Sequence, residues 1–291
     1  MYIQKDLKLD NDAYTKYVTL YMQSEGKPKA CIIYFHGGGL LYGNRCDLPQ
    51  THLNMLTDAG YAILAYDYPL APAVKLDTIL ADVCSSIENY KRDLLDLTGL
   101  DLPYFLWGRS SGAYLCLLAA SKNCFSRKPL GILSYYGYGF LCDSWFNTPS
   151  NHYTKLPAMP ESCLDGVPKV IHANGDLDTH YSVYVYARQT GKWLDLMYEG
   201  RLKYFFVDYT LRLCDKMPCP IFCAHSTGDT DVPYSESIEL CNKYSAQRFI
   251  ASGDVHDFDR DHTSAVTEQL LTSSIRFLDN LVESATQARM N

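Results

Sequence analysis

The sequence predicts an α/β fold with a mostly parallel central sheet and helices on both faces. Short, continuous apolar runs bounded by turn residues recur along the chain, as they do in strands that are buried on both faces. Segments with apolar residues at helical spacing lie between these runs, and strands that alternate with helices form parallel sheets. The length of 291 residues is sufficient for one such domain with a large core.

Six apolar runs are the strand candidates. They are residues 30–35, 61–66, 103–107, 130–135, 219–224 and 247–251. Helical spacing of apolar residues extends over 76–97 and again over 266–281. The segment 111–122 is almost entirely apolar, as expected of a crossover helix that packs on a sheet.

Residues 141–217 interrupt this alternation and are rich in tyrosine and tryptophan. We interpret them as an insertion that folds over the carboxyl edge of the sheet within a single domain of residues 1–291. Ordinary helices with an aromatic core are the alternative, and the sequence favours neither, because a cap needs an aromatic core of its own.

Composition excludes several classes of protein. A net charge of −7 without a basic block does not support binding to nucleic acid or to anionic membranes. No apolar run approaches the ~20 residues of a membrane span, and the N-terminus lacks the apolar core of a signal peptide. The eleven cysteines are scattered and lack zinc-site spacing even at Cys214, Cys219 and Cys223. We therefore expect reduced thiols, a cytoplasmic location, and no metal or organic cofactor.

The strongest chemical signal is Gly-Arg-Ser-Ser-Gly at residues 108–112, which matches G-x-S-x-G. It follows the strand candidate 103–107 and opens the apolar segment 111–122, and this strand–turn–helix context is what a nucleophile elbow requires. Glycines allow the sharp turn. Ser110 is therefore the predicted nucleophile, and an ordinary glycine-rich turn between a strand and a helix is the alternative.

A serine hydroxyl needs a base to become nucleophilic, and the base follows it in the chain in this kind of site. His256 lies in a polar, glycine-containing loop after the last strand candidate, where a base can reach the elbow. His262 is the rival, but it is nearer to the expected start of the last helix. His225 ends a strand candidate and is expected to pack beside the loop that carries the acid.

Two aspartates follow the strand candidate 219–224 and could orient the base. Asp229 begins the pattern D-x-x-V-P and is the preferred acid. Asp231 is expected to cap the helix that follows, because acidic residues are favourable near a first helical turn.

Backbone N–H groups are the expected donors to an oxyanion. The sequence His-Gly-Gly-Gly at 36–39 directly follows the first strand candidate, as in the oxyanion loops of lipases and esterases. The predicted donors are Gly37, Gly38 and Ser111, with His36 as a structural residue of the loop. A phosphate-binding loop is the rival, but neither G-K-[ST] nor G-x-G-x-x-G completes it.

Taken together, these residues resemble the hormone-sensitive-lipase-like branch of the α/β-hydrolases, a family of small carboxylesterases with relatives that cleave formamides. The resemblance covers about residues 30–135 and 219–282. It is carried by H-G-G-G at 36–39, Y-P-L-A-P at 68–72, G-x-S-x-G at 108–112, D-x-x-V-P at 229–233 and the loop histidine His256. The chain departs from the usual G-D-S-A-G-G at Arg109, Ser111 and Ala113, and Ala73 replaces the usual Glu after L-A-P.

The resemblance implies an α/β-hydrolase fold with a cap inserted after the sixth strand. It also implies a catalytic triad of Ser110, Asp229 and His256 acting on a small-molecule ester with a short-chain or aromatic acyl group. An amide-cleaving enzyme of the same fold is the alternative, and a non-catalytic ligand-binding scaffold is a weaker one, since all three triad residues are present. Nothing in the sequence excludes a homodimer.

Overall fold

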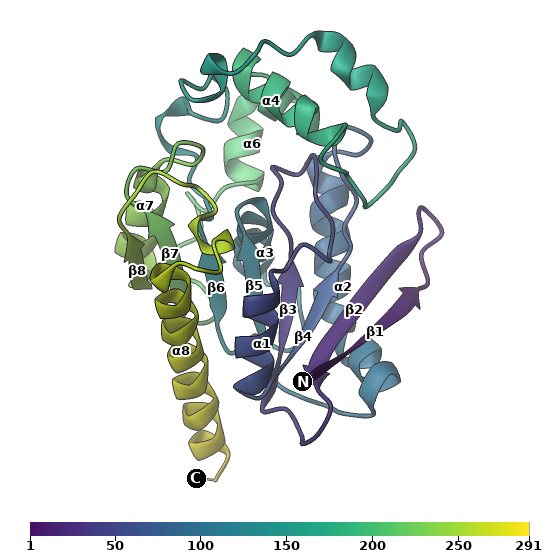
Figure 1. Ribbon diagram of the computed structural model, residues 1–291, viewed down its shortest axis with the longest axis vertical. Coiled ribbons are helices and arrows are strands. Elements are labelled where there is room, and N and C mark those ends of the chain that lie inside the picture. The colour runs from purple at the N-terminus through teal and green to yellow at the C-terminus, as the bar shows by residue number, and fades with distance from the viewer. Residues whose placement is uncertain (291) are drawn as a thin grey trace.

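The computed structural model describes residues 1–290 and contains one eight-stranded sheet with the order β1-β2-β4-β3-β5-β6-β7-β8 (Figure 1). The strands are β1 (Tyr2–Leu9), β2 (Lys16–Gln23), β3 (Ala30–Phe35), β4 (Tyr61–Tyr66), β5 (Tyr104–Arg109), β6 (Ile132–Tyr135), β7 (Ile221–Ser226) and β8 (Gln247–Ala251). Strands β3 to β8 run parallel, whereas β1 pairs antiparallel with β2 and β2 with β4. The predicted α/β fold with a mostly parallel sheet is therefore confirmed.

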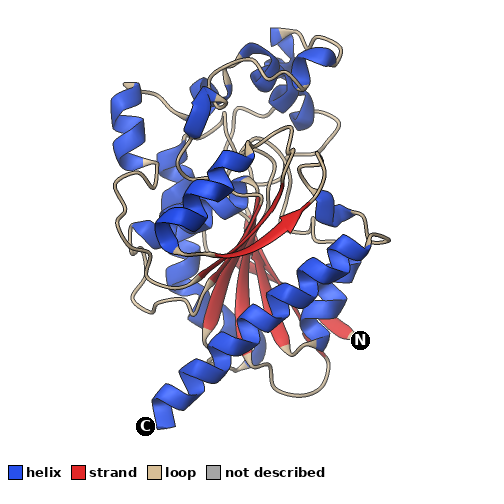
Figure 2. Ribbon diagram, turned by 90° about the vertical axis from the view of Figure 1, so that its left-hand side faces the viewer, coloured by secondary structure: helices blue, strands red, loops and turns tan. Residues whose placement is uncertain are grey.

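Helices cover both faces of this sheet, and the long C-terminal helix crosses one of them (Figure 2). The helices are α1 (Gln50–Asp58), α2 (Leu76–Thr98), α3 (Ser111–Ser121), α4 (His180–Thr190), α5 (Trp193–Met197), α6 (Leu202–Asp208), α7 (Tyr234–Tyr244) and α8 (Ala265–Met290). Apolar side chains of α2, α3 and α7 belong to the core on one face, and those of α1 and α8 to the core on the other. No helix within residues 1–290 is long and apolar enough to cross a membrane.

Strand β3 shows why the strands are continuously apolar. Cys31, Ile33 and Phe35 pack into the core on the α2 and α3 side, while Ile32 and Tyr34 pack into the opposite core. Successive side chains of a strand point to opposite faces, so a strand covered on both sides needs apolar residues at every position. Each buried aliphatic or aromatic side chain contributes about 1.5–3 kcal/mol through its removal from water.

All six strand candidates are present, three with the predicted bounds and three with ends displaced by one or two residues. Strands β1 and β2 and helix α1 have no counterpart in the sequence-based prediction, whereas α7 corresponds to the helix expected after Asp231. In β1, Gln4, Lys5 and Asp6 are exposed, so this edge strand lacks a continuous apolar run. Helix α1 buries His52 and Thr57 beside only two leucines, which weakens its helical pattern.

Residues 141–217 lie over the carboxyl ends of the parallel strands and contain α4, α5 and α6 (Figure 1). They also contain three short 3₁₀ turns at Cys142–Ser144, Tyr153–Lys155 and Glu161–Gly166. Trp145 stacks on Trp193 with ring centroids 5.5 Å apart, and Tyr138 meets both rings edge-on. These aromatic side chains are part of the same core as α2 and α3, so the segment packs directly on the sheet domain.

The close packing of α3 depends on two glycines. A Cβ atom at Gly112 would overlap the carbonyl oxygen of Phe35, and one at Gly108 would overlap the backbone of Gly112. Because the obstructing atoms are backbone, a rotamer change cannot relieve either overlap. Gly108 and Gly112 are the two glycines of the G-x-S-x-G motif, and both are required by the approach of α3 to β3 and β5.

We predict that Gly112→Ala lowers the free energy of unfolding by about 2–3 kcal/mol, because backbone must move to admit the methyl group. Gly166→Ala is the matched control, since the nearest atom to its Cβ is the Thr179 methyl carbon at 3.7 Å. Urea titrations followed by circular dichroism measure both variants. Equal stability of the two variants would contradict this explanation of the motif.

Candidate active site

Ser110 occupies a strained turn between β5 and α3. Its backbone has φ 52° and ψ −120°, a conformation that non-glycine residues rarely adopt and that costs about 1–3 kcal/mol. The Ser110 N–H donates to the carbonyl oxygen of Tyr135 on β6 at 2.9 Å, which fixes the turn to the sheet. The side chain is thereby presented at the carboxyl edge of the sheet, and the residue retains 8% exposure.

The structure brings Ser110, His256 and Asp229 together in one chain of hydrogen bonds. His256 comes from the loop between β8 and α8, and its Nε2 lies 2.9 Å from Ser110 Oγ. Its Nδ1 lies 2.7 Å from Oδ2 of Asp229, which comes from the loop after β7. The neutral imidazole that donates from Nδ1 to the carboxylate leaves Nε2 free to accept the serine proton.

The Asp229 carboxylate is buried and fully hydrogen-bonded. Oδ1 accepts the backbone N–H groups of Asp231 and Val232 at 2.8 and 2.9 Å. Oδ2 lies 3.1 Å from Nε2 of His225 as well as 2.7 Å from His256. Burial disfavours the charged carboxylate, but the charges and hydrogen bonds of the two histidines outweigh it and hold the pKa of Asp229 well below its usual range.

The same balance acts on His256, but it shifts the pKa in the opposite direction. Burial disfavours its protonated form, but the nearby Asp229 carboxylate outweighs burial and raises the pKa of His256 to about 9. The edge of the Tyr136 ring supports the imidazole, with ring centroids 4.7 Å apart. Sequence reasoning assigned no role to Tyr136, although it directly follows a strand candidate at the edge where the site residues gather.

The expectation that Asp231 caps the following helix is wrong. Helix α7 begins after Pro233 without a side-chain cap. The Asp231 carboxylate instead accepts the Tyr184 hydroxyl and lies 3.2 Å from Nε of Arg188, because both partners reach it from α4. The rival base His262 is exposed and has no hydrogen bond to Ser110 or Asp229 among the described residues.

The loop after β3 passes directly beside the nucleophile. A Cβ atom on Gly37 would lie 3.3 Å from Cβ of Ser110, and Gly38 has φ 99° and leaves no room for a side chain beside Tyr42. Within residues 1–290, the N–H groups of Gly37 and Gly38 make no hydrogen bond to another backbone group. The N–H of Ser111, at the first position of α3, has no partner within its helix.

Two aromatic residues form hydrogen bonds to backbone carbonyl groups of this loop. The Tyr68 hydroxyl lies 2.9 Å from the carbonyl oxygen of His36 and 3.2 Å from that of Gly37. The Trp193 indole donates to the carbonyl oxygen of Gly39 at 2.8 Å. Tyr68 begins the Y-P-L-A-P segment, so that motif supports the glycine loop, and His36 is buried as a structural residue that stacks on Tyr68.

Ser110 and His256 line a cleft of about 870 Å³. Four tyrosines, which we call the tyrosine wall, line the side formed mainly by residues 141–217: Tyr42, Tyr153, Tyr181 and Tyr184. Their rings contact one another at centroid distances of 5.3 to 5.6 Å between neighbours. Charged groups also line the cleft, including Asp47, Asp257 and Arg260.

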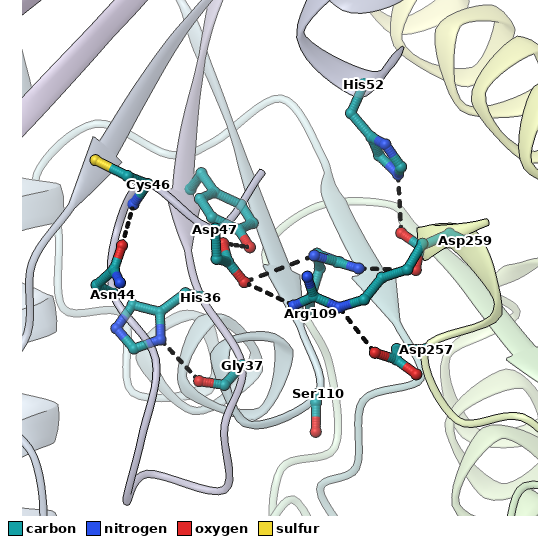
Figure 3. Close-up of polar contacts among 12 residues, drawn as sticks. His36, Gly37, Asn44, Cys46, Asp47, His52, Arg109, Ser110, Asp257 and Asp259 are labelled. Carbon is teal, nitrogen blue, oxygen red and sulfur yellow. Dashed lines mark hydrogen bonds and ion pairs between the residues drawn. The ribbon is translucent and has the colours of Figure 1, made fainter. Parts of the chain in front are cut away.

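A buried charged network lies beside the elbow (Figure 3). Arg109, which directly precedes Ser110, pairs with Asp259 at 2.9 Å, and Asp259 also contacts His52 at 2.8 Å. Sequence reasoning singled out Arg109 as a departure from a family motif but assigned no role to Asp259 or His52. The sequence feature that could have indicated a role for Asp259 is its position, three residues beyond the predicted base His256.

Solved structures with this architecture include hydrolases. A protein with unknown function from Staphylococcus aureus subsp. aureus Mu50 is 28% identical, with a TM-score of 0.79 over 96% of this chain and 99% of that one. An α/β-hydrolase superfamily protein from Enterococcus faecalis is 23% identical, with a TM-score of 0.77 over the same shares. A hyperthermophilic esterase from the archaeon Pyrobaculum calidifontis is 15% identical, with a TM-score of 0.68 over 97% of this chain and 86% of that one. The predicted α/β-hydrolase fold is confirmed.

The BD-FAE family model matches residues 18–244, most of the chain, and the chain belongs to this family. Among curated proteins, the non-reducing polyketide synthase adrD from Penicillium rubens is 30% identical over 151 residues, which are 48% of this chain and 6% of that protein. The match thus covers less than a tenth of the length of this relative. The narrower hormone-sensitive-lipase-like branch remains a prediction.

We predict that Asp229→Asn lowers the pKa of His256 from about 9, since the variant loses the charge that opposes burial most strongly and keeps only the weaker effects of Asp231 and Asp257. NMR titration of the imidazole measures this shift. Asp279→Asn, on the remote helix α8, is the control that leaves the titration unchanged. A His256 pKa that is the same in wild type and Asp229→Asn would contradict the assigned electrostatics.

Proposed function

We propose that this chain is a serine hydrolase that cleaves carboxylic esters through an acyl-enzyme on Ser110. The observation that carries this proposal is the hydrogen-bonded chain from Ser110 Oγ through His256 to the buried Asp229, at 2.9 and 2.7 Å, opening into a cleft. Membership in the BD-FAE family and the likeness to esterase structures support it. Apart from the ester and water, the proposed reaction uses only groups that the chain itself supplies.

In acylation, His256 Nε2 takes the proton of Ser110 as Oγ attacks the ester carbonyl carbon. The carbonyl oxygen becomes an oxyanion, for which the N–H groups of Gly37, Gly38 and Ser111 are the proposed donors. The imidazolium then gives its proton to the leaving alkoxide as the ester C–O bond breaks. Asp229 orients the imidazole and stabilises its charged form throughout.

In deacylation, a water molecule takes the place of the alcohol. His256 removes a proton from the water as its oxygen attacks the acyl-enzyme carbonyl, and the same donors stabilise the second oxyanion. The proton returns to Ser110 Oγ as its bond to the acyl carbon breaks, which releases the carboxylic acid. The site is thereby restored without any net change in its residues.

Substrate choice is proposed to depend on residues 141–217, which we assign as a cap on a single domain. The tyrosine wall presents flat, rigid rings toward the cleft, a surface suited to aryl groups and to short acyl chains. Asp231 also lines the cleft, but it is paired with Arg188 and therefore offers no unpaired charge beside the wall.

We predict that Ser110→Ala lowers kcat for p-nitrophenyl acetate by about four orders of magnitude or more, because no acyl-enzyme can form. Ser284→Ala, an exposed serine on α8, is the control with unchanged turnover. Near-normal turnover by folded Ser110→Ala protein would refute the proposal. Parallel rates on an ester and the matching anilide decide between an esterase and an amide-cleaving enzyme.

We predict that p-nitrophenyl acetate and butyrate are hydrolysed with a kcat/KM at least about tenfold higher than that of p-nitrophenyl dodecanoate. The reason is that the tyrosine wall limits the length of acyl chain that the cleft accepts. Tyr181→Ala should narrow this ratio by opening the wall, whereas Tyr204→Ala, exposed on α6, should leave it unchanged. Preference of the wild type for the dodecanoate would contradict the proposed role of the wall.

A further inference from the structure

The residue before the nucleophile belongs to a buried ion network. Arg109 is 2% exposed, and its Nη2 donates to Oδ1 of Asp259 at 2.9 Å. Its Nε donates to the Tyr136 hydroxyl at 2.6 Å, and its Nη1 lies 3.6 Å from Oδ2 of Asp47. In Figure 3 the guanidinium lies between the two carboxylates while Ser110 points away from the network.

Asp259 is the centre of this network and is completely buried. The Tyr136 hydroxyl donates to the same Oδ1 at 2.9 Å, and Nε2 of His52 lies 2.8 Å from Oδ2. Burial disfavours the carboxylate, but the charge of Arg109 and the His52 contact outweigh it and hold the pKa of Asp259 well below its usual range. The carboxylate therefore remains charged and fully paired.

The ion pair between Arg109 and Asp259 connects the strand that ends beside Ser110 to the loop that carries His256. Arg109 immediately precedes Ser110 at the end of β5, and Asp259 follows His256 by three residues in the 3₁₀ turn Phe258–Arg260. Residues 252–255 and 260–263 are exposed, and Asp259 is the one fully buried position in 252–263. The loop that carries the base is thus anchored, on its C-terminal side, to the residue next to the nucleophile.

Tyr136 adds a second connection. Its hydroxyl bridges Arg109 and Asp259, while its ring contacts the imidazole of His256 at 4.7 Å. The Tyr136 side chain therefore contacts both the Arg109–Asp259 ion pair and the imidazole of His256. On the other side of the loop, the Ser226 hydroxyl donates to the carbonyl oxygen of Val255 at 2.7 Å, so the loop is held at both ends.

We propose that Asp259, held by Arg109, is a positioning residue that fixes His256 within hydrogen-bonding distance of Ser110. This inference rests on the proposed function and deepens it. Asp259 acts through the loop and not on the substrate, and the fork of the guanidinium supplies the directional contact that an apolar anchor would lack. Displacement of a reacting group by about 1 Å can reduce a rate by about 100-fold, so such an anchor matters for turnover.

The test compares three variants by kcat, KM and the pH profile of kcat/KM on p-nitrophenyl acetate. Asp259→Asn should lower kcat by about 30- to 100-fold with KM changed less than about threefold. The matched control is Asp82→Asn, which removes the carboxylate partner of buried Lys16 away from the cleft. That control loses stability in the same way but should keep wild-type kcat.

His52→Phe is the second variant, and it decides the question if Asp259→Asn does not fold. It removes one hydrogen bond to Asp259, keeps an aromatic ring beside Trp107 and leaves both charges of the ion pair in place. We expect kcat to fall about three- to tenfold.

The pH profile separates positioning from stability. The carboxylates that face His256 are Asp229, Asp231 and Asp257, and all three are retained in every variant. If the loop loosens, the contact between His256 and Asp229 weakens and the pKa of His256 falls. The acid limb of the kcat/KM profile should therefore move to lower pH in Asp259→Asn and in His52→Phe. It should stay in place in Asp82→Asn.

Unchanged kcat and an unmoved acid limb in folded Asp259→Asn or His52→Phe would overturn the inference and leave Asp259 a purely structural residue. The proposed function would still stand in that case, provided that turnover depends on Ser110. Wild-type protein without any turnover that depends on Ser110 would instead remove the proposed function, and the positioning role with it.

Discussion

The sharp turn at Ser110 is the constraint on which the rest of the site depends. Helix α3 can begin directly after β5 only because Gly108 and Gly112 have no side chains at the points where backbone meets backbone. The turn places Ser110 at the carboxyl edge of the parallel strands. The glycine loop after β3, the Asp229 loop after β7 and the His256 loop after β8 all reach the same edge, since parallel strands end there together.

Two buried carboxylates then determine where the base lies. Asp229 contacts the imidazole directly, and Asp259 anchors the loop that carries it. Each carboxylate has histidine at Oδ2 and other donors at Oδ1, so each remains charged despite its burial. Directional ion pairs and hydrogen bonds, more than apolar contacts, therefore hold an otherwise exposed loop beside the nucleophile.

Sequence patterns predicted the parallel strands because burial on both faces imposes a continuous apolar run. They also predicted that Ser110, Asp229 and His256 would be brought together, since these residues follow β5, β7 and β8, which are parallel strands of one sheet. Edge strand β1 has an exposed, polar side, and its pattern is correspondingly weak. The true partners of Asp231 and Asp259 lie 47 and 150 residues away, on α4 and β5, and no local pattern reports contacts of that kind.

The most direct test of Ser110 as an activated nucleophile is to incubate the wild-type chain with a fluorophosphonate probe and locate the adduct by mass spectrometry, with His256→Ala as the comparison. We expect a phosphonyl group on Ser110 Oγ, formed with loss of fluoride, in the wild type and its absence in the variant. Well-folded wild-type protein that carries no adduct, or an adduct on another residue, would contradict the assignment of Ser110 as an activated nucleophile.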